Sequence, residues 1–143
     1  MSGSIESLVV DTGPIVAVLL AGDQHHAWAV DAFGKLTPPL TTCESVVSEA
    51  QFVLRRLGGD PIKVLELLRA GLLEIDFSLQ SELDRILELQ RSYRNVPMSL
   101  ADACIVRMSE LRPRCRVMTT DSDFRIYRRN RRNVIPLLAP PGM

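Results

Sequence analysis

The sequence predicts one α/β domain of three layers, in which helices cover both faces of a central parallel sheet. Short apolar stretches typical of buried strands alternate with helical stretches along the chain. Neither a repeat nor a linker interrupts this alternation, and a chain of 143 residues suits one domain. We therefore expect residues 1–143 to fold as a single α/β/α unit.

Each predicted strand is a short apolar run bounded by turn-forming or acidic residues. The first strand covers residues 5–10 and ends at Asp11, after which Gly13 and Pro14 start a helix. Further strands are expected over residues 40–43, 72–77, 115–120 and 134–138.

The predicted helices lie between these strands and follow known start and stop signals. Gly58 and Gly59 end one helix, Pro61 occupies the first position of the next, and Pro97 breaks the chain before Ser99. Helices are expected over residues 14–21, 24–36, 44–57, 61 onward, 79–93 and 99 onward.

Composition and sequence ends indicate a cytoplasmic protein without membrane association. Apolar residues make up 46% of the chain and charged residues 24%, close to the average of folded soluble domains. The longest uncharged apolar run, residues 13–22, is shorter than the roughly 20 residues that cross a bilayer. The N-terminus lacks the basic opening of a signal peptide. The three cysteines match no zinc motif, which predicts reduced, buried thiols.

Three acidic residues follow predicted strands directly. Asp11 ends the first strand, and Asp121 and Asp123 follow the strand over residues 115–120. Ligands of open parallel sheets bind at the carboxyl ends of the strands, so we expect these carboxylates to meet at one edge. Structural alternatives exist, since Asp11 could cap the following helix and Asp121 could form an Asx turn.

Asp102 is a single acidic side chain within the apolar stretch 100–106. A helix that is apolar on nearly every side is buried. A buried carboxylate must be paired or bound to a metal, because leaving it alone is costly. Ser99 stands three residues earlier, where it could form a capping box with Asp102. The two roles are compatible, and we expect Asp102 to contact a metal ion.

Glu49 stands near the edge of the apolar face of the predicted helix 44–57. Steps of 100° per residue group the apolar side chains into one arc and place Glu49 about 40° beyond it. Glu44, at the other edge, lies in the first turn, where the helix dipole stabilises an acid. Glu49 is therefore the better candidate ligand.

A set of carboxylates without His or Cys suits Mg²⁺ or Mn²⁺ rather than zinc. Several carboxylates at one site repel each other, and a divalent ion stabilises them together. One or two such ions can produce hydroxide from water and neutralise charge on a scissile phosphate. The acidic residues therefore predict hydrolysis of phosphodiester bonds.

Four short acidic motifs occur in order along the chain: Val9-Val10-Asp11-Thr12, Val47-Ser48-Glu49-Ala50, Leu100-Ala101-Asp102-Ala103 and Thr120-Asp121-Ser122-Asp123-Phe124. Their order and spacing resemble the PIN-domain family, especially the VapC-type toxins of bacterial toxin–antitoxin pairs, over nearly the whole chain. The resemblance implies a PIN fold with a central parallel sheet, dependence on Mg²⁺ or Mn²⁺, endoribonuclease activity, homodimers and, for the toxins, a small antitoxin partner. It also implies a catalytic metal site formed by Asp11, Glu49, Asp102 and Asp121, with Asp123 alongside as a ligand directly or through water.

Basic residues gather in the C-terminal third of the chain. Residues 1–90 hold 6 basic and 13 acidic side chains, whereas residues 91–143 hold 11 and 4, and all eleven basic residues are Arg. Arg suits bidentate phosphate contacts, although such a block could also be a solvated face. Because Arg125, Arg128 and Arg129 directly follow the last acidic motif, we expect them to bind RNA phosphates.

Two other functions are compatible with acidic residues on a parallel sheet. A phosphoacceptor receiver domain also gathers Asp residues there, but no Lys follows Lys63 to stand near an acyl phosphate. A non-catalytic RNA-binding or partner-binding module is the stronger alternative. Metal-dependent cleavage of RNA separates that module from a nuclease, because binding alone leaves the RNA intact.

Overall fold

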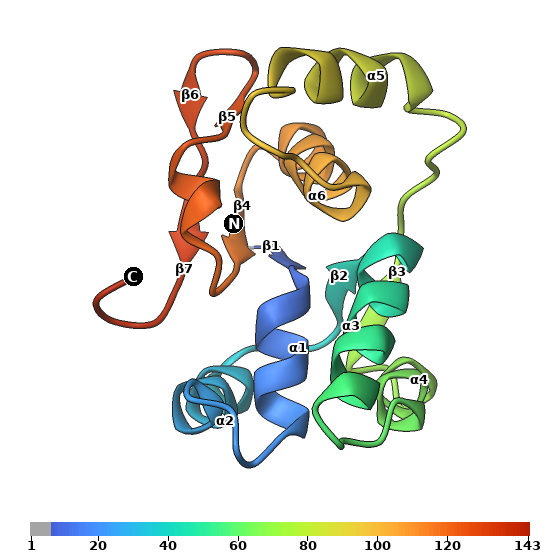
Figure 1. Ribbon diagram of the computed structural model, residues 1–143, viewed down its shortest axis with the longest axis vertical. Helices are drawn as coiled ribbons and strands as arrows, with labels where there is room; N and C mark the ends of the chain where they lie inside the picture. The colour runs from blue at the N-terminus through green and yellow to red at the C-terminus, as the bar shows by residue number, and fades with distance from the viewer. Residues whose placement is uncertain (1–6) are drawn as a thin grey trace, which may run out of the picture.

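The central sheet contains five strands, all paired in parallel, in the order β3-β2-β1-β4-β7. The computed structural model describes residues 7–143 (Figure 1). The strands of this sheet are β1 Ser7–Val10, β2 Leu40–Thr42, β3 Leu73–Ile75, β4 Cys115–Met118 and β7 Leu137–Leu138.

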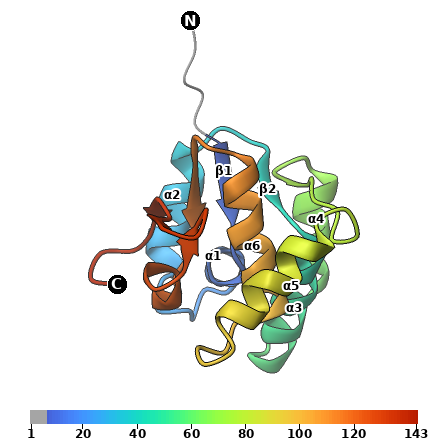
Figure 2. The ribbon, with the colours of Figure 1, turned by 90° about the horizontal axis from the view of Figure 1, so that it is seen from above.

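Helices lie on both faces of this sheet, which confirms the predicted α/β/α arrangement. Figure 1 shows α5 and α6 on one side of the strands and α1 and α2 on the other. Seen from above in Figure 2, β1 lies between α2 and α6. The helices are α1 Thr12–Leu19, α2 His26–Lys35, α3 Glu44–Arg56, α4 Ile62–Arg69, α5 Leu83–Ser92 and α6 Leu100–Leu111.

β1 lies in the middle of the sheet, where the order of the strands changes direction. Val9 pairs with Thr41 of β2 on one side and with Val117 of β4 on the other. At the carboxyl ends of β1 and β4, the Asp11 N–H donates to the carbonyl of Met118, the last residue of β4 (2.9 Å). A ligand crevice is expected at the carboxyl ends of strands at such a switch point.

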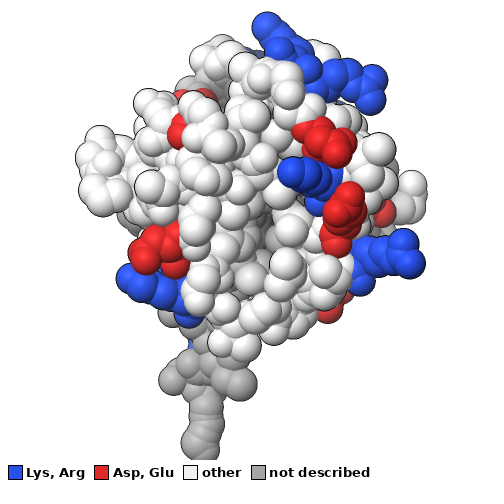
Figure 3. Space-filling model, turned by 90° about the horizontal axis from the view of Figure 1, so that it is seen from below, with Lys and Arg blue, Asp and Glu red and all other residues white. Residues whose placement is uncertain are grey.

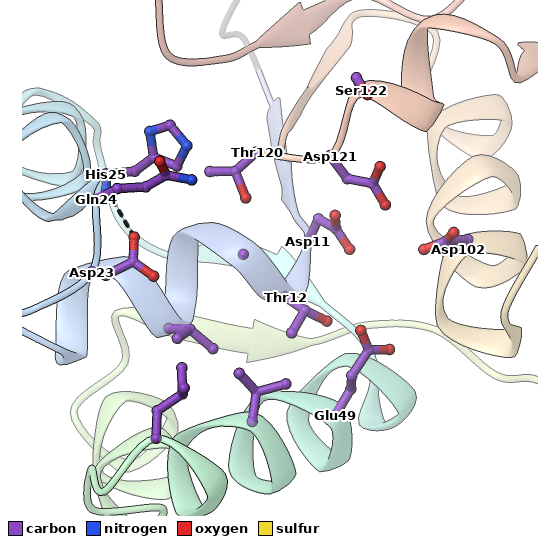
Figure 4. Close-up of a pocket in the computed structure, with 14 residues that line it drawn as sticks. Asp11, Thr12, Asp23, Gln24, His25, Glu49, Asp102, Thr120, Asp121 and Ser122 are labelled. Atoms are coloured by element: carbon purple, nitrogen blue, oxygen red, sulfur yellow. Dashed lines mark hydrogen bonds between the residues drawn. The ribbon is translucent and has the colours of Figure 1, made fainter.

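The buried core fixes α6 against this part of the sheet. Val9 and Val117 of the sheet and Ile105 and Val106 of α6 are fully buried. Burying one such side chain contributes roughly 1.5–3 kcal/mol relative to leaving it exposed. The predicted burial of α6 is thereby confirmed, and the first turn of α6, which carries Asp102, lies beside the carboxyl edge of the sheet (Figure 4).

α5 begins at Leu83, later than the predicted start at residue 79. The preceding residues form turns, in which the Ser81 N–H donates to the Ser78 hydroxyl (3.2 Å) and the Glu82 N–H donates to the Ser78 carbonyl (3.2 Å). A serine side chain that bonds nearby backbone in this way competes with helix formation.

The last predicted strand, over residues 134–138, is wrong as a single element. β6 (Asn133–Val134) pairs in antiparallel fashion with β5 (Arg128–Arg129), and only β7 joins the central sheet. Pro136 separates the two pieces because it has no N–H to continue a ladder. The three-residue turn of this hairpin contains Asn130 and Arg131, both with positive φ (52° and 69°). A 3₁₀ helix over Ser122–Arg125 was also not predicted.

Two predictions from composition concern membranes and cysteines. Within residues 7–143, no helix has the length and apolar character needed to cross a bilayer. Cys43, Cys104 and Cys115 are buried and form no disulfide, which confirms the prediction of buried, reduced thiols.

Candidate metal centre

A pocket of about 450 Å³ opens at the carboxyl ends of β1 and β4. Four predicted acidic residues line it, each delivered by a different part of the fold. Figure 4 shows their carboxylates directed toward a common space. These residues are Asp11 between β1 and α1, Glu49 of α3, Asp102 of α6 and Asp121 after β4.

Asp11 is held in the pocket by hydrogen bonds. It occupies the N-cap position of α1, as one alternative expected, but its side chain forms no capping hydrogen bond there. The Thr119 hydroxyl donates to Asp11 Oδ2 (2.8 Å) and accepts from the Asp121 N–H (3.0 Å). Thr119, itself fully buried, therefore links two of the acidic residues.

Burial raises the pKa of Asp11 from its ordinary value of 3.8 to about 7. Hydrogen bonds from Thr119 and from the Thr12 backbone oppose this rise, and the charges of Asp102 and Asp121 add to it. The Asp11 carboxyl is therefore partly protonated near neutral pH when no cation is beside it.

Asp102 lies in the first turn of α6 and lines the pocket. The Ser99 hydroxyl accepts a hydrogen bond from the Asp102 N–H (3.0 Å), which confirms Ser99 as the N-cap of α6. The carboxylate lines the pocket and accepts a hydrogen bond from the Tyr127 hydroxyl at Oδ2 (2.8 Å). Burial raises the pKa of Asp102, the Tyr127 bond lowers it, and the charge of Asp121 raises it further.

Tyr127 and Thr119 are positioning residues that the sequence analysis missed. Tyr127 is fully buried, and its ring packs edge-on against Tyr93 and Phe124, with centroids 5.2 Å apart in both pairs. A buried tyrosine needs a partner for its hydroxyl, but only the folded chain shows that this partner is Asp102.

Replacing Tyr127 with Phe should weaken metal-dependent activity more than it weakens the fold. The lost hydroxyl no longer orients Asp102 or lowers its pKa, and such outer-shell partners affect metal affinity by about 10-fold to 100-fold. In the metal-dependent ribonuclease that the motifs imply, we expect the Mn²⁺ concentration for half-maximal RNA cleavage to rise by that factor. Tyr93→Phe is the matched control, since the Tyr93 hydroxyl accepts from the Arg128 N–H instead. An unchanged Mn²⁺ dependence would assign Tyr127 to packing alone.

Glu49 lies partly exposed at the rim of the same pocket, as predicted for the edge of the apolar face. Burial and the charge of Asp102 raise its pKa, and the nearby Thr12 hydroxyl lowers it. That hydroxyl is buried but has no hydrogen-bond partner of good geometry in the described chain. Glu44 is exposed and lies outside this pocket, in line with its weaker candidacy.

Asp121 forms the predicted Asx turn and still faces the pocket. Its Oδ1 accepts a hydrogen bond from the Asp123 N–H (2.9 Å), which caps the 3₁₀ helix. Asp123 does not line the pocket, but its charge contributes to raising the pKa of Asp102. The structure thus brings four of the five predicted carboxylates to one space and leaves Asp123 beside it.

Gly13 allows the Asp121 loop to approach α1 closely. A Cβ at Gly13 would lie 1.9 Å from the Thr120 hydroxyl, so a larger residue would displace Thr120. Because Thr120 directly precedes Asp121, glycine at this position helps to hold the loop in place.

Mg²⁺ or Mn²⁺ fits the donor chemistry of the pocket, because its acidic side chains supply oxygen ligands. Burial raises the pKa values of Asp11, Glu49 and Asp102, and a cation beside these carboxyls would favour their ionised forms. Between residues 7 and 143, however, no three His, Cys, Asp or Glu side chains stand in a ready-made metal-binding arrangement. Mg²⁺ usually keeps several waters and contacts one or two carboxylates directly. The four carboxylates of the pocket therefore suit an ion that is held partly through water, or an ion that draws these side chains closer together when it binds.

The three predicted RNA-binding arginines differ in how freely they could reach a phosphate. Arg125 is exposed, and its Nε donates to the Met143 carbonyl (3.1 Å). Arg128 donates to three nearby carbonyls, and Arg129 donates to those of Ser109 and Pro113. The last two arginines thus brace the β5–β6 hairpin, which leaves Arg125 as the most available of the three.

Charges on the face drawn in Figure 3 do not form a cationic patch. Lys and Arg side chains lie there in small groups with Asp and Glu, around a largely uncharged centre. The β5–β6 hairpin lies at the other end of the molecule, at the top of Figure 1.

Comparisons with solved structures show the fold. The chain superposes on Mycobacterium tuberculosis VapC20, a toxin that cleaves the sarcin-ricin loop, with a TM-score of 0.74 and 18% identity over 82% of this chain and 92% of that one. A toxin–antitoxin complex from Klebsiella pneumoniae gives a TM-score of 0.54 and 20% identity over 81% and 88%. No protein-family model and no curated protein matches the chain. The PIN-like fold that the motifs implied is thereby confirmed.

Proposed function

We propose that this protein is a divalent-metal-dependent endoribonuclease, and that it acts as the toxin of a toxin–antitoxin pair. The observation that carries this proposal is the convergence of four acidic side chains on one pocket at the switch point of the sheet. Its fold, shared with a toxin that cleaves RNA, adds support.

The residues of the pocket have distinct tasks in this proposal. When bound, Mg²⁺ or Mn²⁺ supplies an activated water and offsets charge on the scissile phosphate. Asp11, Glu49, Asp102 and Asp121 hold the cation, and Asp123 contributes alongside, directly or through water. Thr119 and Tyr127 keep two of these carboxylates oriented.

A cleavage assay tests the proposal. Purified protein should cut single-stranded or hairpin RNA in Mg²⁺ or Mn²⁺ and should stop when EDTA removes the ion. RNA that is bound but left intact with either ion would contradict the nuclease and favour a non-catalytic RNA-binding module.

Arg125 should guide RNA toward the pocket, because acidic side chains alone would repel the phosphate backbone. Arg125→Ala should weaken RNA binding and lower the slope of log affinity against log salt by about 0.7 per lost phosphate contact on single strands. Arg69→Ala is the control, since Arg69 ends α4 next to the amino end of β3, at the opposite edge of the sheet. An identical salt slope in wild type and Arg125→Ala would show that Arg125 is merely solvated.

Exposed apolar side chains support association with a protein partner. Val30 of α2 is 48% exposed, and Phe52 of α3 and Ile62 of α4 are each 61% exposed. Phe52 and Ile62 lie on α3 and α4, which contact each other, and exposed apolar groups on neighbouring elements often mark interfaces. We propose that this chain forms a homodimer and binds a small antitoxin. If the protein is a toxin, the gene directly upstream should encode that antitoxin.

A further inference from the structure

The pocket extends well beyond the four carboxylates. The rest is lined by Gly13 and Val16 of α1, Val53 of α3 and Leu57 at the end of α3, residues 23–25, Thr120 and Ser122. An octahedral ion with six waters fills roughly 200 Å³ at about 30 Å³ per water. A pocket of about 450 Å³ therefore has room for a larger group next to the ion.

One wall of this additional space is apolar. Glu49, Val53 and Leu57 follow each other at intervals of four residues, so they form one stripe along α3 and its end. The stripe runs about 12 Å along the helix axis, from the carboxylate to Leu57. Leu57 is 57% exposed, and Val53 is partly exposed. These side chains offer a solvent-facing apolar surface directly beside the acidic groups.

The opposite wall carries free hydrogen-bonding groups on a braced loop. Asp23 Oδ1 accepts from the His25 N–H (2.8 Å), and His26 Nδ1 is 2.7 Å from the Ala17 carbonyl, which fixes the loop to α1. The Gln24 amide and the His25 imidazole form no hydrogen bond with any residue of the described chain. In Figure 4 Gln24 and His25 lie side by side, with Thr120 between them and the carboxylates.

We propose that this part of the pocket binds the base of a nucleotide adjacent to the scissile phosphate, and that Gln24 and His25 determine which base is accepted. The inference rests on the proposed ribonuclease function. A nucleobase has apolar faces and an edge of donors and acceptors, which match the Val53–Leu57 wall and the amide and imidazole groups.

The charge of the pocket argues against a phosphate in the same place. Among the described residues, no Lys or Arg lines the pocket, and Asp23 adds a carboxylate to the loop. A phosphate would therefore meet several carboxylates without a Lys or Arg to offset them, whereas an uncharged base avoids this repulsion. The phosphates of the same strand would follow the outer surface, where Arg125 is exposed.

Cleavage of an RNA pool randomised around one scissile bond tests this subsite. Wild type should favour one base at a single adjacent position. The preference for that base should fall by up to about tenfold in each of three pocket variants, Gln24→Ala, His25→Ala and Leu57→Ser. A tenfold change corresponds to the free energy of one hydrogen bond or one buried contact. Gln80→Ala and Leu65→Ser, which change exposed residues outside the pocket, are the matched controls and should keep the preference. Thermal unfolding of each variant checks that the fold is retained.

The outcomes separate this inference from the nuclease proposal. A wild-type protein that leaves the pool intact would contradict the nuclease itself. Cleavage without a base preference, or with a preference that all three pocket variants retain, would overturn the base subsite alone. An equal loss of rate for all four bases would likewise overturn it, because the loop would then only support the fold.

Discussion

Asp102→Asn should abolish RNA cleavage while leaving the metal-free fold at least as stable as wild type. Loss of this carboxylate removes a direct or water-mediated metal ligand, so the rate should fall by more than the roughly 100-fold that outer-shell changes cause. Stability should be kept because Asn relieves repulsion from Asp121 and can still accept the Tyr127 hydroxyl bond. Single-turnover cleavage and thermal unfolding in EDTA measure the two effects.

The N-cap bond of α6 runs from the Asp102 N–H to the Ser99 hydroxyl, and Ser99 also lowers the pKa of the Asp102 carboxyl. The Asp102 N–H donates to Ser99, and this bond survives the change to Asn. Ser99→Ala makes the complementary change. It removes the N-cap hydroxyl of α6, which should cost about 1 kcal/mol of stability, and it leaves the Asp102 carboxylate in place. A large loss of stability in metal-free Asp102→Asn would instead mean that this carboxylate serves the fold.

Stability of the metal-free protein should fall as the pH rises from about 4 to about 7. The Asp11 carboxyl titrates near 3.8 in the unfolded chain and near 7 in the folded one. Between these pH values the Asp11 carboxyl holds a proton in the folded state but not in the unfolded state. The contribution of Asp11 to stability is therefore complete below pH 3.8 and is lost by about pH 7. The shift corresponds to at most roughly 4–5 kcal/mol at about 1.4 kcal/mol per pH unit. The raised pKa values of Glu49 and Asp102 act in the same direction.

Urea unfolding in EDTA at several pH values measures this slope. Asp11→Asn should flatten the slope and be more stable than wild type at pH 7.5, because a neutral side chain is buried at every pH. Added Mn²⁺ should stabilise wild type more at pH 7.5 than at pH 5, since the ion competes with the proton. Equal slopes in wild type and Asp11→Asn would show that Asp11 is already ionised at low pH.

The acidic residues that line the pocket could be predicted because their signals are local. Asp11 and Asp121 follow apolar strands, and parallel strands carry their carboxyl ends to one edge. Asp102 stood out because a carboxylate in an apolar helix needs a partner. The expectation that they meet at one edge rested on the parallel sheet that alternating strands and helices indicated, and the strand order β3-β2-β1-β4-β7 comes from the structure.

The groups that orient these carboxylates could not be predicted, because they act across long stretches of chain. Thr119 lies 108 residues from Asp11, and Tyr127 lies 25 residues from Asp102. Nothing in the sequence around a buried threonine or tyrosine names its hydrogen-bond partner. The same holds for Arg129, which looked free in the sequence but donates to the backbone of α6 and of the segment after it.

The location of bound Mn²⁺ tests the account most directly. Anomalous diffraction from crystals soaked in Mn²⁺ should show one or two peaks among Asp11, Glu49, Asp102 and Asp121, with oxygen ligands at about 2.0–2.2 Å or through water. Asp102→Asn crystals treated in the same way should lose or weaken these peaks. A pocket without a peak at saturating Mn²⁺, in a protein that still cleaves RNA, would contradict the assignment of these carboxylates as the metal site.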